Sequence, residues 1–223
     1  MTTIPRNDPS KLLILLKEGG GKEADLKNVI LKGQDLSGIS FMKADLSASD
    51  LSDSVMVGCQ LSFANFSGTN LSNVVFDRSY AHHTSFSHAN LSNARMEKGF
   101  LNNADLSDAT CLHLKIKDLT AIRGKFVRSN LRGVHFENLG LSLCDFTGAD
   151  LSHATLTKSR LHRATFLECD LSEADFGASQ VYGADFSKAS ISRARFIGCK
   201  YDRATRWPGA PPEGAIFEEK PDL

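Results

Sequence analysis

Apolar residues recur at every fifth position from residue 24 to residue 203, without one break in register. Steps of five from Leu26 to Tyr201 meet 36 positions, of which 16 hold Leu and 11 hold Phe. An α-helix repeats near 3.6 residues and a β-strand at 2, so neither explains this period. A short fixed period is typical of a solenoid, in which each repeat packs on its neighbours.

The positions around these apolar centres are also restricted. Two residues before the centre the chain carries 14 Ala, six Ser and four Cys in the 36 units, so this position also points inward. Asp or Asn precedes the centre 14 times, and Ser follows it 14 times. Short polar side chains hydrogen-bond to backbone groups at corners, so we expect Asp45, Asp105 and Ser107 to be structural and not catalytic.

The repeating unit, Ala-Asp-Leu-Ser-x, stands at residues 44–48 and 104–108 and resembles the pentapeptide repeat family. The resemblance covers about four fifths of the chain. It implies an all-β fold, a right-handed quadrilateral β-helix in which four pentapeptides make one coil of 20 residues. A second period of 20 in the sequence favours the same coil, because one column holds Phe66, Phe86, Phe126, Phe146, Phe166 and Phe186. The 36 units predict nine coils and a rod about 43 Å long.

Two segments flank the repeat domain of residues 24–203. Residues 1–23 predict a capping segment with a short helix that begins near Asp8 and ends at the glycines 19–21. A partner-binding helix is the alternative. Residues 204–223 contain Trp207 and several prolines and predict a C-terminal cap, with Ile216 or Phe217 packed under it. Capped ends hide backbone groups that would otherwise recruit another chain. The resemblance also implies a homodimer through the C-terminal end.

One coil is irregular, at residues 109–125. Leu114 and Leu119 occupy positions that elsewhere hold small residues, and Leu112 and Ile122 occupy outward positions. Two interpretations stay open together. The first is a local bulge with compensating packing, and the second is an exposed apolar spot.

Composition limits the class of protein. Lys and Arg number 26, as do Asp and Glu, so there is no global attraction to nucleic acid or to an anionic membrane. The longest apolar run, residues 12–16, is too short to span a bilayer or to serve as a secretory signal. We therefore expect a cytoplasmic protein. The five cysteines fall at inward positions without metal-ligand spacing, and their odd number argues against a disulfide framework.

No catalytic or cofactor site emerges from the 20-residue map. The seven histidines scatter over all four sides, and no Ser/His/Asp or Cys/His set converges. The glycines at 19–21 lack the ending of a phosphate-binding loop. A convex rod offers no deep pocket that excludes water. We expect a protein that is not an enzyme and needs no metal or cofactor.

The four sides differ in charge. Each side comprises the residues within two positions of its centres and is named by its first centre: Leu26, Leu31, Leu36 or Phe41. Over residues 24–203 the net charges are −3, −2, +1 and +5 respectively. The Phe41 side also gathers outward apolar groups, and its centres Ala81 and Ala121 predict a shallow dent. The candidate interaction residues on this side are Tyr80, His82, His83, Phe100, Ile122, Arg123, Leu143, Arg160, His162, Arg163 and Tyr182.

Three functions follow from this surface. Arg beside aromatic residues is typical of an interface core, which favours a non-catalytic scaffold that docks an unidentified protein. The family resemblance implies the alternative, a DNA-mimicking modulator or protector of DNA gyrase. Duplex DNA would carry on the order of 25 charges over this length, whereas the two acidic sides together have a net charge of −5. Direct nucleic-acid binding is the third hypothesis, and five net positive charges are few for it.

Overall fold

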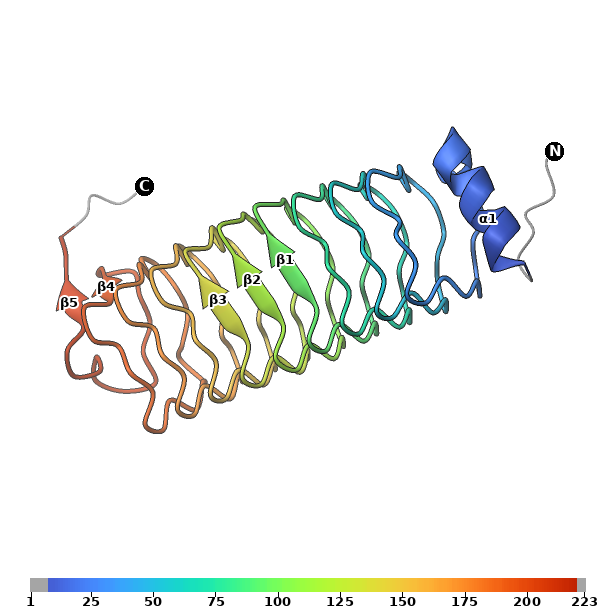
Figure 1. Ribbon diagram of the computed structural model, residues 1–223. Coiled ribbons are helices and arrows are strands. Elements are labelled where there is room, and N and C mark those ends of the chain that lie inside the picture. Colours follow the sequence, from blue (N-terminus) through green and yellow to red (C-terminus); the bar gives the residue numbers. More distant parts are fainter. Residues whose placement is uncertain (1–7, 220–223) are drawn as a thin grey trace.

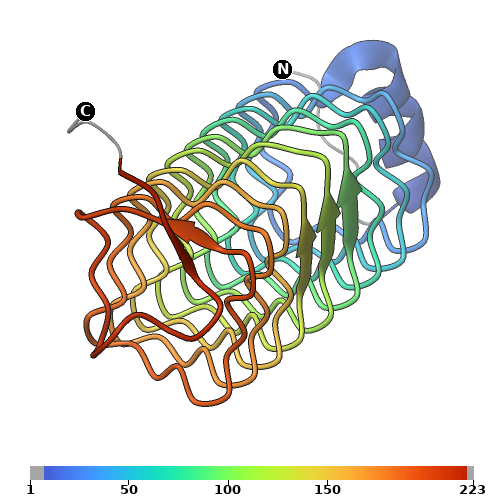
Figure 2. The same ribbon diagram turned by 90° about the vertical axis from the view of Figure 1, so that its left-hand side faces the viewer.

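The computed structural model of the protein describes residues 8–219, which wind into a four-sided tube of stacked coils (Figure 1, Figure 2). Parallel β-bridges join residues twenty apart, from Asp25 and Asp45 near one end to Gln180 and Lys200 near the other. The predicted β-helix with a coil of 20 residues is therefore confirmed. Residues 1–7 and 220–223, which belong to the two predicted end segments, lie outside the described residues.

Each bridge is carried by one residue per side of the coil. The Asp45 N–H donates to the Ala24 carbonyl oxygen at 2.9 Å, and the Asp45 carbonyl oxygen accepts from the Leu26 N–H at 2.7 Å. Bridges remain single at most positions because each side is only five residues long and turns at both ends. The coils are thus held together by backbone hydrogen bonds that any sequence can make, and the side chains decide the shape.

The corners are tight because one position in nearly every repeat has a positive φ angle, with Lys188 and Arg203 as the exceptions. The Ala44 N–H donates to the Phe41 carbonyl oxygen at 2.9 Å and closes a four-residue turn. Lys43, the third residue of that turn, has φ 59°. Positive φ at the third position defines a type II turn, which Gly and Asn enter most easily. The repeat therefore favours small or polar residues at this corner position.

The acidic residue before each centre stabilises the chain on the far side of that centre. Asp45 Oδ1 accepts from the Ser47 N–H at 3.0 Å, and Asp105 Oδ1 accepts from the Ser107 N–H at 2.9 Å. These contacts satisfy backbone N–H groups that form no hydrogen bond with a neighbouring coil. Asp45, Asp105 and Ser107 thus have the structural contacts that the sequence predicts.

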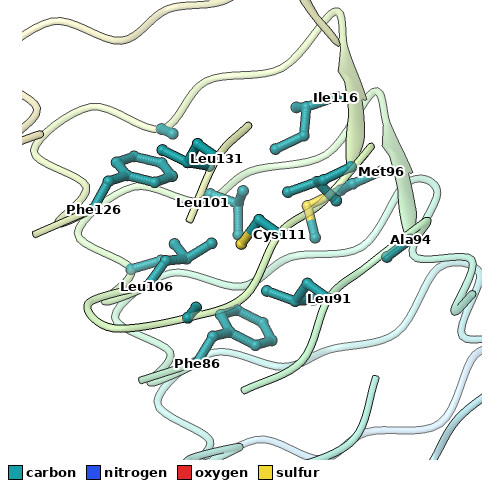
Figure 3. Packing of buried hydrophobic residues seen from close by; sticks show 14 of the residues in the cluster. Phe86, Leu91, Ala94, Met96, Leu101, Leu106, Cys111, Ile116, Phe126 and Leu131 are labelled. Atoms are coloured by element: carbon teal, nitrogen blue, oxygen red, sulfur yellow. The ribbon is translucent and has the colours of Figure 1, made fainter. Parts of the chain in front are cut away.

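Phenylalanine rings fill the centre of the tube. All 36 centres are buried except Ile191 and Tyr201, which are half-buried. Along one column, ring centroids lie 5.0 Å apart for Phe146 and Phe166 and 4.6 Å apart for Phe166 and Phe186, with planes within 3° of parallel. Leu106 interrupts this column (Figure 3). Like side chains stack because residues twenty apart become vertical neighbours.

The small inward position supplies hydrogen bonds as well as room. Ser79 Oγ donates to the Met56 carbonyl oxygen at 2.7 Å, and Cys144 Sγ donates to the Ala121 carbonyl oxygen at 2.9 Å. All five cysteines are buried, and burial raises the pKa of each thiol to about 12. Cys111 points into the core (Figure 3). These thiols pack as small apolar groups.

In the irregular region of the repeat, three-residue β-strands replace the single bridges of the other coils. The strands β1 (Arg95–Glu97), β2 (Lys115–Lys117) and β3 (His135–Glu137) lie side by side and pair in parallel (Figure 1). Leu119 and Leu139 follow β2 and β3, and both are buried at positions that usually hold a small residue. The hydrogen-bonded turn of the other corners is replaced there by a longer strand and an open bend. The irregularity expected within residues 109–125 therefore extends over three coils.

A helix lies across the first coil. The helix α1 (Pro9–Leu15) begins after Asp8, whose side chain accepts from a backbone N–H of the first turn at 3.1 Å, and it continues into the π-helical turn η1 (Leu16–Gly20). Leu12 and Leu16 are buried in the same cluster as the repeat centres. Among residues 8–219, no helix has the length and apolarity needed to cross a bilayer.

Trp207 takes the place of the next phenylalanine at the other end. The last bridge joins Asp185 to Arg206, twenty-one residues apart, so the chain gains one residue after Tyr201. This insertion puts Trp207, and not residue 206, above Phe186. The two rings stack at 4.8 Å with an interplanar angle of 5°. The aromatic column thus continues beyond the repeat.

The expectation that Ile216 or Phe217 packs under the C-terminal segment is wrong. These two residues form β5 (Ile216–Phe217), which pairs in parallel with β4 (Lys200–Tyr201). Their side chains remain 46% and 48% exposed. The Trp207 ring already covers the apolar end of the tube. The final strand, β5, therefore pairs with β4 and does not cross the core.

Candidate interaction surface

The ladder of bridges brings most of the predicted interaction residues onto one wall. Tyr80 pairs with Phe100, Phe100 with Thr120, and the ladder continues through Gly140 to Arg160. The remaining candidates stand two or three positions further along the same side of the same coils. Their placement together follows from the 20-residue coil.

Aromatic rings on this wall stack on one another and are exposed to solvent. The ring centroids of Tyr80 and Phe100 lie 5.4 Å apart, and those of His82 and Phe100 lie 5.5 Å apart. Tyr80 and Phe100 are 41% and 38% exposed. Each ring is held by its neighbour, so a partner that covers them has few side-chain rotamers to immobilise.

Sequence analysis missed Phe63, which lies on the Phe41 side and is 56% exposed. Its ring stacks on His83 at 4.9 Å with an interplanar angle of 2°. Phe63 occupies the positive-φ corner position, with φ 64°, and so does Leu143, with φ 62°. Among residues 8–219 these are the only two large apolar residues at that position, and both lie on this side. The backbone conformation costs a bulky residue about 1–3 kcal/mol, which points to a role outside folding.

Exposed apolar side chains concentrate on this wall. Within residues 24–203, eight large apolar residues are more than a third exposed. Five of the eight lie on the Phe41 side: Phe63, Tyr80, Phe100, Ile122 and Leu143. They occupy successive coils, so they form a continuous patch. Contiguous apolar patches on otherwise polar surfaces mark interaction sites.

The prediction that Tyr182 projects from this wall is wrong. Tyr182 is only 6% exposed, because the C-terminal segment lies over it and its hydroxyl donates to the Glu218 carboxylate. Burial first, and then the hydrogen bond and charge of Glu218, raise the pKa of Tyr182. His162 is half-buried beside it, with its Nε2 3.0 Å from Gln180 Oε1. The exposed patch therefore ends near His162.

Five of the six bases of the Phe41 side fall into two classes. Three bases near its two ends form ion pairs with glutamates from other segments: Lys43 with Glu23 at 3.6 Å, Lys200 with Glu218 at 2.8 Å, and Arg203 with Glu219. Arg123 and Arg160, in the middle, form no ion pair with any residue of the range 8–219. The middle of the wall therefore presents guanidinium groups without carboxylate partners, directly beside the apolar patch.

The wall is hollowed between Phe100 and Arg160. The hollow has a volume of about 400 Å³, and Thr120, Ile122 and Gly140 are among the residues that line it. A hollow is therefore present on the wall where the sequence predicts a dent. Ala121, a buried centre, is not among the residues that line it, whereas Gly140 is.

Within the part of the chain that the structure describes, no three His, Cys, Asp or Glu side chains gather to hold a metal ion. His153 lies 3.2 Å from Glu173, which also pairs with Arg193, and this cluster is exposed on the Leu31 side.

A comparison with protein-family models matches the description "Pentapeptide repeats", with eight copies, over residues 22–117 and 125–200. The unmatched residues 118–124 lie in the irregular coil. No catalytic family is indicated. No curated protein matches the sequence.

A solved structure shows the same fold. HetL, a pentapeptide repeat protein involved in heterocyst differentiation regulation from the cyanobacterium Nostoc sp. strain PCC 7120, is 20% identical, with a TM-score of 0.66 over 93% of this chain and 91% of that one. QnrB1, a plasmid-mediated fluoroquinolone resistance protein, is 16% identical over 74% of this chain and 93% of its own, with a TM-score of 0.37. Since the family model matches well over half of the residues and the backbone coils every twenty, this chain belongs to the pentapeptide repeat family.

Proposed function

We propose that this chain is a non-catalytic interaction module, a rod that docks a partner protein through the Phe41 side. The observation that carries the proposal is the patch of stacked, exposed aromatic rings next to Arg123 and Arg160, which have no carboxylate partner among residues 8–219. Aromatic residues and Arg are enriched in the centres of protein interfaces. The proposed contact residues are Phe63, Tyr80, His82, His83, Phe100, Ile122, Arg123, Leu143, Arg160, His162 and Arg163.

The proposal also covers the number of coils and the two ends of the rod. We take the repeat as nine coils, with the helical segment covering one end and the Trp207 segment covering the other. Burial of Leu12 and Leu16 against the first coil and stacking of Trp207 on Phe186 support these capping roles. The homodimer through the C-terminal end and the cytoplasmic location stay predictions.

Affinity capture from the native host tests the docking proposal. We expect wild-type protein to capture a specific protein, and the variant Phe100→Ala with Arg123→Glu to lose it, because the variant removes a central ring and reverses a charge. Arg132→Glu on the opposite Leu31 side is the matched control, since Arg132 is also exposed and forms no ion pair within residues 8–219. All three proteins should melt at similar temperatures. Equal capture by all three would contradict the proposal.

The alternative role at DNA gyrase has less support from the surface. Several acids on the Leu26 and Leu31 sides are already paired within the chain, such as Asp45 with Lys27 at 3.3 Å and Asp108 with Arg128 at 2.7 Å. Pairing reduces the negative field that a mimic of duplex DNA requires. The gyrase role stays a prediction, and a change in supercoiling caused by the purified protein would favour it.

A further inference from the structure

Gly140 is one of the residues that line the hollow on the Phe41 side. Gly140 stands in the ladder between Thr120 and Arg160, one coil from each. Phe100 and Tyr80 occupy the same ladder position on earlier coils, so the backbone there accepts large side chains. Gly140 and Thr120 both line the space of about 400 Å³, together with Leu119, which follows the bend at Asp118.

The hollow combines an apolar rim with a cationic end. Phe100 and Ile122 are among its apolar lining residues, and Lys98 and Arg160 are its lining bases. Arg123 neighbours Ile122 in the chain. Asp118, the one acid that lines the hollow, accepts from Asn138 Nδ2 at 2.9 Å at the edge of the Leu36 side. The hollow therefore offers apolar contact flanked by positive charge.

Contacts within the protein show that the basic side chains of this wall pair with carboxylates. At the C-terminal end of the wall, Glu218 pairs with Lys200 and accepts a hydrogen bond from the Tyr182 hydroxyl, while Glu219 pairs with Arg203. Both glutamates directly follow the apolar strand β5. An extended apolar-acidic segment of the chain thus occupies one end of the same wall.

We propose that the hollow over Gly140 binds an extended acidic segment of the partner protein. One aromatic or large aliphatic side chain of that segment enters the hollow between Phe100 and Arg160, and neighbouring carboxylates pair with Arg123 and Arg160. These two arginines are offset by two coils, about 10 Å along the rod at strand spacing, and they occupy different positions across the wall. Arg binds carboxylates in a bidentate geometry. The inference rests on the proposed docking through this side and adds the chemistry of the partner.

The form of the hollow argues for a peptide over a small molecule. A small-molecule site buries most of its ligand and has convergent polar groups. Here Phe100, Ile122 and Arg160 are exposed, and the floor is open to solvent. A single side chain held by a longer segment suits such a shallow space, since contacts on both sides of it add to the affinity.

Selection from a random 12-residue peptide display library on the full-length protein tests the inference. Peptides that bind Arg132→Glu as well as wild type, but not Arg160→Glu, are kept and sequenced. We expect a net negative charge and an aromatic or large aliphatic residue close to Asp or Glu. Synthetic copies should bind Arg160→Glu on the order of tenfold or more weakly. Gly140→Leu, which adds a side chain to the lining of the hollow and crowds Thr120, should weaken them similarly. Thermal melts check that each variant is folded.

Three results would overturn the inference. The first is that no peptide prefers wild type to Arg160→Glu, and the second is that the selected peptides carry no excess of acidic residues. The third is that a 20-base-pair DNA duplex displaces them at low salt, which would indicate a nucleic-acid surface. If the host partner is still lost with Phe100→Ala and Arg123→Glu, the docking proposal stands and only the chemistry assigned to the hollow fails.

Discussion

Replacing Phe166 with alanine is expected to lower the free energy of unfolding by about 3–5 kcal/mol. The ring is fully buried and stacked between Phe146 and Phe186, and it meets Phe176 edge-on at 5.7 Å. A coil in a solenoid contacts only its neighbours, so no central mass of residues can move in to fill the cavity. The cost should therefore lie near the upper end for such substitutions.

Urea denaturation of two control variants separates the cavity from a general effect of losing a ring. Phe166→Leu should cost clearly less than the alanine variant, because Leu106 already occupies the same column and is buried there. Phe63→Ala should leave stability nearly unchanged, since it removes a ring that is 56% exposed and keeps a side chain at the same positive-φ corner. An alanine variant at Phe166 that lies within about 1 kcal/mol of wild type would mean that the column does not support the rod.

Trp207→Ala is expected to open the C-terminal end of the rod. Trp207 stacks on Phe186 and meets Phe196 edge-on at 5.2 Å, so its removal exposes both rings to water. We expect a loss of about 2–4 kcal/mol, somewhat less than for a fully buried ring. The loss should be local, because coils in the middle of the rod do not contact Trp207.

Hydrogen exchange measured by mass spectrometry shows where the loss occurs. Backbone amides of residues 181–206 should exchange faster in Trp207→Ala, while those of residues 61–86 should not change. Phe217→Ala is the control, because this ring is 48% exposed and touches the rod only edge-on at Tyr201. Uniform faster exchange along the rod, or none at the C-terminal end, would show that Trp207 does not cap the final coil.

The coil and its columns could be predicted from the sequence because they depend on period alone. Once residues twenty apart are neighbours, the side on which Tyr80 or Phe100 lies is fixed, and the bridges place both as expected. Burial of the centres follows for the same reason. No long-range contact had to be guessed.

The errors fall where the chain leaves its period. Tyr182 was expected on the surface because its position in the repeat faces outward, but Glu218, thirty-six residues later, covers it. Ile216 and Phe217 were expected inside because they are apolar, but the one-residue insertion before Trp207 gave that space to the indole ring. Contacts made by a terminal segment have no periodic signal.

The details of the candidate surface needed backbone geometry as well as sequence. Phe63 and Leu143 are conspicuous only once the corner position is known to have a positive φ angle. The hollow depends on Gly140, which stands in the ladder between larger residues. Aligning the 36 units shows which residue departs from its column, but the backbone geometry is needed to show what the departure does.

Site-specific photo-crosslinking in the native host tests most directly whether the Phe41 side is the docking surface. A photoreactive phenylalanine analogue at Phe100 reports on this wall, and the same analogue at Asn90, an outward ladder position, reports on the Leu31 side. Our account predicts a discrete crosslinked protein from position 100 that is absent from position 90, and predicts that Arg123→Glu removes it. Crosslinking from position 90 alone, or equally from both positions, would contradict it.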